Sequence, residues 1–254
     1  MSTVRVDDRE GGVRFLILDR PPANAIDETL LSDLSAALRD AGADDDLRAV
    51  VLTGAGSFFS AGFDLKAPQR DEQSTLQLLN LYREAHLRLL TLPKPTVAMM
   101  NGHAIAGGLV LVLACDYRLG VQGDYRIGLN EVAIGASYPK VAFEIVRLRL
   151  THARACELIL GAALYPVTEA LRLGVVEELL PPDTFETTVM RRAARLGTFP
   201  REAYAHAKAA FLAEVVARLE AETPEEAARG ASVWMTPESR AARAAQRERL
   251  DKST

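Results

Sequence analysis

The sequence predicts a protein of the α/β class. Short apolar runs that are typical of buried strands alternate with amphipathic segments up to about residue 140, and the chain then becomes nearly continuous helix. The chain has 254 residues, of which 48% are hydrophobic, so it is long enough to bury a large core. We therefore expect strands and helices in alternation, followed by a helical C-terminal region.

The first elements are delimited by proline and aspartate. The apolar run over residues 13–18 predicts a strand, and the proline pair within residues 21–26 ends it. Asp27 then precedes a helical pattern over residues 28–41. Because an aspartate carboxylate accepts hydrogen bonds from the first amides of a helix, Asp27 is the predicted N-cap.

The same order of strand, turn and helix follows. Residues 48–53 and 96–100 are predicted strands, and residues 71–92 between them form a predicted amphipathic helix that Pro93 and Pro95 end. The apolar positions of this helix recur at helical spacing and include Leu76, Leu79, Tyr82 and Leu89. A pair of short strands is expected at residues 117–120 and 125–127.

The second half of the chain reads mainly as helix. Alanine, arginine and glutamate dominate the last fifty residues, and helix propensity supports this assignment. We expect a core over residues 1–197 and a helical region over residues 198–254 that covers the core or packs on another subunit. One strand is expected at 175–180, and helices are expected at 140–148, 151–160, 167–172, 183–196, 201–220, 224–234 and 237–250.

Charge and composition exclude several classes of protein. The formal net charge of -4 gives no basic surplus for binding nucleic acid, and no run of 18 apolar residues is present to cross a membrane. Residues 1–8 lack a basic and then apolar export signal, so we expect a soluble cytoplasmic protein. Cys115 and Cys156 stand apart from any Cys/His cluster, so we expect reduced core cysteines and no metal site.

Two glycine-bearing turns are the main functional signal. Residues 60–64 and 101–108 each follow an apolar strand-like run, and the second opens into a buried helix. A helix that begins at Gly107 leaves its first amides unpaired, which favours an anionic oxygen there. Each turn alone also fits ordinary turn chemistry. A nucleotide fingerprint at residues 53–59 is disfavoured because Phe59 occupies its third glycine position.

Five segments together carry a family resemblance. In order and spacing they resemble the crotonase superfamily of enoyl-CoA hydratases and isomerases. The resemblance implies repeated ββα units, a helical C-terminal region for trimerisation, and a homotrimer or a hexamer of two trimers. The five segments are residues 19–26, 60–65, 101–108, 115–118 and 128–131.

The resemblance implies a site for an acyl-CoA thioester. By position, the backbone amides of Phe63 and Gly107 form an oxyanion hole that holds the thioester oxygen and stabilises an enolate. Preorganised donors of this kind are typically worth about 2.7–4 kcal/mol each. Coenzyme A enters as part of the substrate, so no separate cofactor is expected.

Two further positions bear on the reaction. Hydratases that this sequence resembles have two glutamates; Glu131 matches the second, whereas Val110 stands at the first. The apolar surroundings of Glu131 should raise its pKa toward the range of a proton-transfer group, although a solvated loop glutamate is the alternative. A single base suffices to move a double bond, so we favour a Δ3,Δ2-enoyl-CoA isomerase.

Substrate contacts are expected along the same segments. Lys66 faces a CoA phosphate or is an ordinary solvated lysine, and Arg240, Arg243, Arg247 and Lys252 are further phosphate candidates. The stretch at residues 138–140 departs from the glycine-rich turn of hydratases and should reshape the acyl pocket. The expected substrate-binding residues are Ala23, Ala25, Ile26, Ala61, Gly62, Asp64, Leu65, Lys66, Gly108, Val110 and Asn130.

Three functions remain open on sequence alone. The first is the isomerase, the second is a hydratase or another reaction of the superfamily, and the third is an acyl-CoA-binding protein without catalysis. His86 falls in a predicted helix and His103 in the turn before Gly107, and neither is favoured as a catalytic residue. Asp64 and Asp116 are expected to fix local turns, away from where the resemblance places proton transfer.

Overall fold

The computed structural model describes residues 2–67 and 71–252. Its described strands form two sheets, of six strands in the order β1-β2-β3-β5-β7-β10 and of four strands in the order β4-β6-β8-β9. The larger sheet contains β1 (Val4–Arg9), β2 (Val13–Leu18), β3 (Ala49–Gly54), β5 (Thr96–Met100), β7 (Tyr117–Val121) and β10 (Glu178–Leu180). The smaller contains β4 (Phe58–Ser60), β6 (His103–Ile105), β8 (Arg126–Gly128) and β9 (Leu164–Pro166).

Three consecutive repeats of two strands and a helix build the fold. In each, the first strand joins the larger sheet and the second joins the smaller: β3 and β4 precede α2 (Glu72–Leu90), β5 and β6 precede α3 (Gly107–Ala114), and β7 and β8 precede α4 (Lys140–Arg149). Helix α1 (Glu28–Ala43) follows β2, and Asp27 caps it as expected. The predicted α/β architecture of ββα units is confirmed.

The strand expectations need three corrections. Residues 117–120 and 125–127 do not pair with each other: β7 pairs with β5 and β10, whereas β8 pairs with β6 and β9, because each second strand turns into the smaller sheet. Strand β1 was missed because its charged residues hide the alternation, and β4, β6 and β9 are too short for a periodic signal. Residues 175–177 precede β10 rather than belong to it.

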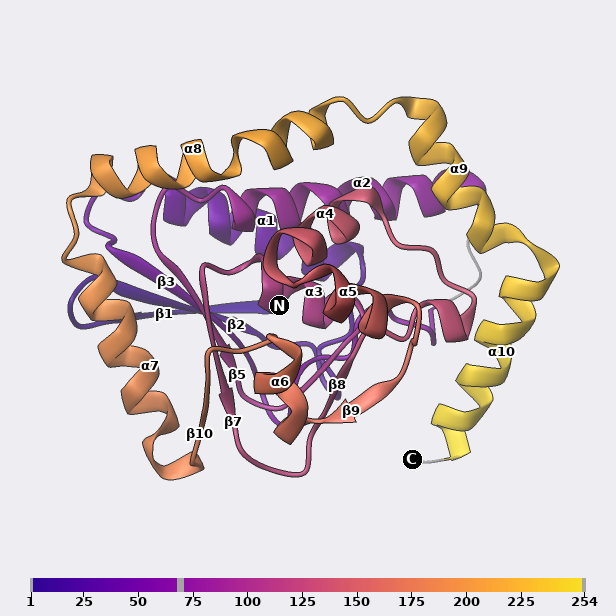
Figure 1. The fold of residues 1–254 in the computed structure, drawn as a ribbon, viewed down its shortest axis with the longest axis horizontal. Helices are drawn as coiled ribbons and strands as arrows, with labels where there is room; N and C mark the ends of the chain where they lie inside the picture. The colour runs from indigo at the N-terminus through magenta and orange to yellow at the C-terminus, as the bar shows by residue number, and fades with distance from the viewer. Residues whose placement is uncertain (1, 68–70, 253–254) are drawn as a thin grey trace.

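The core lies around α3, which Figure 1 shows enclosed near the centre of the molecule. Every residue of α3 is buried, and its sequence is apolar on all sides, as in a helix that has no solvent-facing surface. Strand β3 is also fully buried, between β2 and β5. Cys115, after α3, is buried as expected, whereas Cys156 in α5 (His152–Ile159) is only partly buried, so the expectation of a core cysteine there is wrong; it lies at the margin of the buried face that Ala155, Leu158 and Ile159 form.

The C-terminal helices pack on their own chain. Helix α7 (Pro182–Gly197) covers the larger sheet, α8 (Arg201–Glu220) runs along the molecule near α2, and α9 (Pro224–Met235) leads to α10 (Pro237–Lys252) (Figure 1). Lys208 and Asp116 form a 2.8 Å ion pair that joins α8 to the end of α3. The predicted division at residue 198 and the assembly role of the last helices stay predictions.

The remaining helical segments are short. The region expected as a helix over 167–172 is a 3-10 turn, η2 (Val167–Glu169), followed by α6 (Ala170–Leu173). A second 3-10 turn, η1 (Val132–Ile134), follows Glu131. Among the described residues, no helix is both long enough and apolar enough to cross a membrane.

Candidate active site

The first glycine-bearing turn is hydrogen-bonded to the segment before α1. Ile26 donates its amide to the Gly62 carbonyl at 2.7 Å, and its own carbonyl accepts from the Asp64 amide at 2.9 Å. Since successive amides of an extended segment point to opposite sides, the Phe63 amide faces away from this bridge. It donates to no other residue in the described part of the chain.

Asn24 and Asp64 fix this pair of segments. The buried Asn24 amide donates to the carbonyls of Ala55 and Phe58 at 3.0 and 2.8 Å, and Ser60 donates its hydroxyl to the Asn24 carbonyl at 2.7 Å. Asp64 pairs with Arg20 at 2.6 Å and accepts from the Lys66 amide, which confirms its expected turn-fixing role. The segment at 58–60 continues as β4 rather than a helix, which rules out the nucleotide fingerprint.

The second turn is strained where it enters α3. Ala106, before the helix, has φ 53° and ψ -131°, a conformation that a residue with a side chain adopts only when its surroundings impose it. Gly62, with φ +76°, lies against this residue: an added Cβ would be 2.6 Å from the Ala106 Cβ and 3.1 Å from the Gly107 nitrogen. The two glycine-bearing turns therefore touch.

The amides of Phe63 and Gly107 are both unpaired within the described residues. The contact between Gly62 and the Gly107 nitrogen places the two amides on neighbouring backbone. The Gly107 amide also lies at the positive end of the α3 dipole, where negative charge is favoured. Gly108 packs on the first turn, since an added Cβ would lie 2.4 Å from the Ser60 carbonyl oxygen.

Tyr82 is a site residue that sequence reasoning missed. An added Cβ at Gly107 would lie 3.0 Å from the Tyr82 ring, and the same ring lies 5.1 Å from that of Phe63 and stacks on His86 at 3.7 Å. Tyr82 thus contacts both residues whose amides are unpaired. From the sequence, Tyr82 could be recognised only as one of the apolar positions of the helix α2. Burial lowers the pKa of His86 to about 4, so this ring is neutral.

Glu131 lies between β8 and η1 and is only 5% exposed. Burial raises the pKa of its carboxyl to about 7, and the nearby Tyr138 hydroxyl opposes this shift. Its Oε2 atom is buried without a hydrogen-bond partner among the described residues. The alternative of a solvated loop glutamate is therefore wrong, and the expected apolar environment is confirmed.

Two other predicted site residues are related to Glu131: Val110 stands where hydratases have their first glutamate, and Asn130 precedes Glu131 in the chain. Val110 is fully buried within α3 and offers no polar group. Asn130, adjacent to Glu131, is partly buried, and its Oδ1 atom accepts no hydrogen bond from the described residues. A lone buried acceptor of this kind is costly unless a ligand or water pairs with it.

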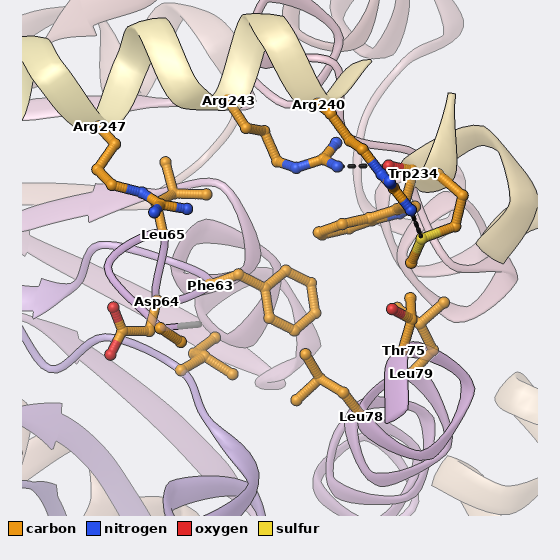
Figure 2. A pocket seen from close by; sticks show the side chains of 13 residues that line it. Phe63, Asp64, Leu65, Thr75, Leu78, Leu79, Trp234, Arg240, Arg243 and Arg247 are labelled. Atoms are coloured by element: carbon orange, nitrogen blue, oxygen red, sulfur yellow. Dashed lines mark hydrogen bonds between the residues drawn. The ribbon is translucent and has the colours of Figure 1, made fainter. Parts of the chain in front are cut away.

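A narrow cavity of about 80 Å³ opens beside Phe63 (Figure 2). Of the predicted site residues, Ile26, Phe63, Asp64 and Leu65 line it, whereas Gly107 and Glu131 do not. The ring of Phe63, which lines the cavity, contacts the ring of Tyr82, and the ring of Tyr82 in turn lies against Gly107. The predicted Ala23, Ala25 and Ala61 do not line it, and Ala61 donates its amide to the Ala23 carbonyl. The other lining residues are Ala67, Thr75, Leu78, Leu79, Trp234, Met235, Arg240, Arg243 and Arg247.

Helix α10 brings three arginines to this cavity. Arg240, Arg243 and Arg247 recur at spacings of three and four, so they share one face of the helix, and Figure 2 shows them along the cavity. Burial and the neighbouring guanidinium charges lower the pKa of Arg243, which donates to the carbonyls of Gly135 and Trp234. Lys66 is exposed and pairs with Asp251 at 2.9 Å. The cavity edge is therefore positively charged.

Comparison with known proteins identifies the family of this chain. The sequence profile described as enoyl-CoA hydratase/isomerase matches residues 8–252. A probable enoyl-CoA hydratase of Mycobacterium avium is 33% identical over 79% of this chain and 78% of its own, and a putative enoyl-CoA hydratase of Thermus thermophilus is 39% identical over 70% and 71%. The crystal structure of human mitochondrial delta3-delta2-enoyl-CoA isomerase superposes with a TM-score of 0.94, at 26% identity over 99% of both chains. The chain belongs to the enoyl-CoA hydratase/isomerase family.

Proposed function

We propose that this protein moves the double bond of a 3-enoyl-CoA thioester to the 2-position. The observation that carries the proposal is the buried Glu131 carboxyl with a pKa of about 7. A base with such a pKa is half-ionised near neutral pH, which suits it both to accept and to return a proton. The buried, apolar Val110 supplies no second group with which to activate water.

In the proposed reaction, Glu131 takes a proton from C2 of the substrate. The C2 electron pair then delocalises over the thioester and the double bond, which gives a dienolate. The unpaired amides of Phe63 and Gly107 donate hydrogen bonds to its oxygen. Glu131 returns the proton to C4, and the double bond forms between C2 and C3, so atoms and charge balance.

The positive edge of the cavity supports binding of the CoA moiety. Arg240, Arg243 and Arg247 would pair with phosphate oxygens, with which guanidinium groups form charge-assisted hydrogen bonds. Lys66 would have to leave Asp251 to join them. No cofactor besides the coenzyme A of the substrate is needed by this reaction, and assembly as a homotrimer or hexamer belongs to the same proposal.

Two other functions are the alternatives to isomerisation. The curated relatives are described as probable or putative enoyl-CoA hydratases, which favours hydration as the second candidate. Hydration would need a group besides Glu131 to position water. The third candidate, an acyl-CoA-binding protein without catalysis, would use the unpaired amides alone.

Incubation with 3-enoyl-CoA and, separately, 2-enoyl-CoA distinguishes the three functions. We expect the absorbance of the conjugated thioester to appear from the first substrate, and the Glu131→Gln variant to lose this activity but still bind acyl-CoA. Loss of the conjugated absorbance from the second substrate would instead support the hydratase. Binding without either change would support the non-catalytic protein.

A further inference from the structure

The Tyr82 hydroxyl is a buried polar group that the proposed reaction leaves unused. Tyr82 is 1% exposed, and its hydroxyl forms no hydrogen bond with any residue that the structure describes. The hydroxyl of Tyr138, also near Glu131, differs because it donates to the Leu129 carbonyl at 3.1 Å. A buried hydroxyl without a partner costs free energy, so a ligand or a water molecule is expected to pair with the Tyr82 hydroxyl.

This hydroxyl lies beside one of the two unpaired amides. An added Cβ at Gly107 would lie 3.0 Å from the Tyr82 ring and 3.4 Å from its hydroxyl oxygen. Because Cβ and the amide nitrogen are both bonded to Cα, the hydroxyl oxygen is at most about 6 Å from the Gly107 nitrogen. A single oxygen that accepts from an amide and from a hydroxyl can bridge donors up to about 6 Å apart. One ligand oxygen can therefore pair with both groups.

Two aromatic contacts fix the Tyr82 ring in this place. The ring of Phe63, which carries the other unpaired amide, lies 5.1 Å away, and the fully buried His86 stacks on the opposite side at 3.7 Å. The Nδ1 atom of the neutral His86 ring lies 2.8 Å from the Tyr82 carbonyl. Since a carbonyl oxygen only accepts, Nδ1 carries the proton and donates it to this bond. The ring is thus held against Gly107 without a bond to its hydroxyl.

The hydroxyl can act only as a hydrogen-bond donor near neutral pH. Burial, and to a lesser extent the charge of the nearby Glu131, raises the pKa of the Tyr82 hydroxyl well above its ordinary value of 10. A phenol of this kind keeps its proton and is no general base. Its hydrogen bond strengthens when the acceptor becomes charged, so an enolate oxygen gains more from it than a neutral thioester carbonyl does.

We propose that the Tyr82 hydroxyl is a third catalytic donor, which binds the thioester oxygen of the substrate together with the amides of Phe63 and Gly107. This inference rests on the proposed enolate chemistry and adds a side chain to its backbone donors. The substrate oxygen supplies the partner that the hydroxyl lacks in the protein. The Tyr82 proton stays on its oxygen throughout, whereas Glu131 carries the proton that moves from C2 to C4.

The Tyr82→Phe variant removes the hydroxyl and keeps the ring contacts. With 3-hexenoyl-CoA, we expect kcat to fall about 10- to 100-fold, the range for the loss of one hydrogen bond to a charged group. KM should stay within about threefold, because the bond is stronger in the transition state than in the bound substrate. Tm should not fall, since the lost hydroxyl has no partner among the described residues.

Tyr204→Phe is the matched control because the Tyr204 hydroxyl is paired. It donates to Asp116 at 3.0 Å from α8, away from the unpaired amides. Loss of this bond should lower Tm by about 2–4 °C and leave kcat and KM within about twofold of wild type. The two variants thus separate activity from stability. Parallel losses of Tm and of activity in Tyr82→Phe would make this tyrosine structural and contradict the proposal.

Binding of 3-ketohexanoyl-CoA separates this inference from the proposed reaction. This thioester forms an enolate in solution, and the enolate absorbs in the near ultraviolet where the ketone does not. We expect the ratio of bound enolate to bound ketone to be at least tenfold lower in Tyr82→Phe than in wild type, with affinity for saturated hexanoyl-CoA changed less than threefold. If isomerase activity is absent but these binding results are obtained, the role of Tyr82 stands while the reaction fails.

Three results would overturn the role of Tyr82. The first is a kcat of Tyr82→Phe within twofold of wild type, and the second is an unchanged ratio of bound enolate to ketone. The third is an equal loss of affinity for hexanoyl-CoA and 3-ketohexanoyl-CoA, which would show that Tyr82 only shapes the site. If Tyr82→Phe does not fold by circular dichroism, Tyr82→Met replaces it with the same expected fall in the enolate ratio, because methionine adapts to irregular gaps.

Discussion

Replacing Glu131 by glutamine should make the protein more stable at high pH. The Glu131 carboxyl has a pKa of about 7 in the folded chain because burial disfavours its charge, against an ordinary value of 4.5. Its stabilising contribution is therefore fully present below pH 4.5 and is lost as the pH rises through 7. The glutamine has nearly the same shape and carries no charge at any pH.

The size of the effect follows from the pKa difference. The shift from 4.5 to about 7 is about 2.5 units, and at about 1.36 kcal/mol per unit the ionised carboxyl costs about 3 kcal/mol above pH 7. For a chain of this size, that corresponds to about 6–12 °C in Tm. We expect Glu131→Gln to melt near wild type at pH 4.5 and about that much higher at pH 8.5.

Thermal unfolding followed by circular dichroism across pH 4.5–8.5 measures this difference. Other groups titrate equally in both proteins, so the gap in Tm isolates Glu131. Glu10→Gln, at an exposed glutamate between β1 and β2, is the matched control and should show no such gap. A gap that does not change with pH, or a variant less stable than wild type at pH 8.5, would refute the assignment of a buried, perturbed carboxyl.

Four further outcomes are expected. In the active enzyme, kcat/KM should rise with pH to a plateau above about pH 7, as Glu131 loses its proton; a flat profile would argue against Glu131 as the base. Gly107→Ala should lower kcat about 100-fold or more because its Cβ would push on the Tyr82 ring and disturb a proposed oxyanion donor, whereas Gly42→Ala in α1, with ordinary contacts, should leave kcat unchanged. Arg247→Gln should raise KM for the CoA ester about tenfold but not for the pantetheine ester, which lacks the nucleotide phosphates, and the exposed Arg249→Gln should change neither. Lys208→Met should lower the free energy of unfolding by about 1.5–3 kcal/mol in urea titration because Asp116 loses its 2.8 Å cation partner on α8 and keeps only Arg149, at 3.8 Å, and the hydrogen bonds from Thr96 and Tyr204; a change below about 1 kcal/mol would show that α8 is held without this pair.

Most elements could be predicted because their signals are local. Asp27 caps α1 and the apolar run of α3 is buried, as propensity and composition indicate. The elements that were missed lack such a signal: β4, β6 and β9 have three residues each, and their conformation depends on neighbours in the smaller sheet. The pairing of β7 with β5 and β10 likewise depends on how the repeats stack.

The candidate site was likewise only partly predictable from the sequence. The turns around Phe63 and Gly107 and the apolar setting of Glu131 could be recognised in the sequence, since glycine and residue order mark them. The role of Tyr82 against Gly107 could not, because its position on α2 only indicates an apolar face. The place of Trp234 against Phe63 could not be predicted either, because it depends on how α9 and α10 pack over the core.

The sequence by itself determined the α/β class, the family resemblance and the residues that carry the proposed chemistry, because these follow from short-range patterns of glycine, charge and apolar side chains. Only the tertiary structure decided which groups meet. The contact of Gly62 with Gly107, the burial that raises the pKa of Glu131, and the contact of Trp234 with Phe63 all depend on residues far apart in the chain. Such contacts depend on packing in three dimensions, which no local pattern specifies.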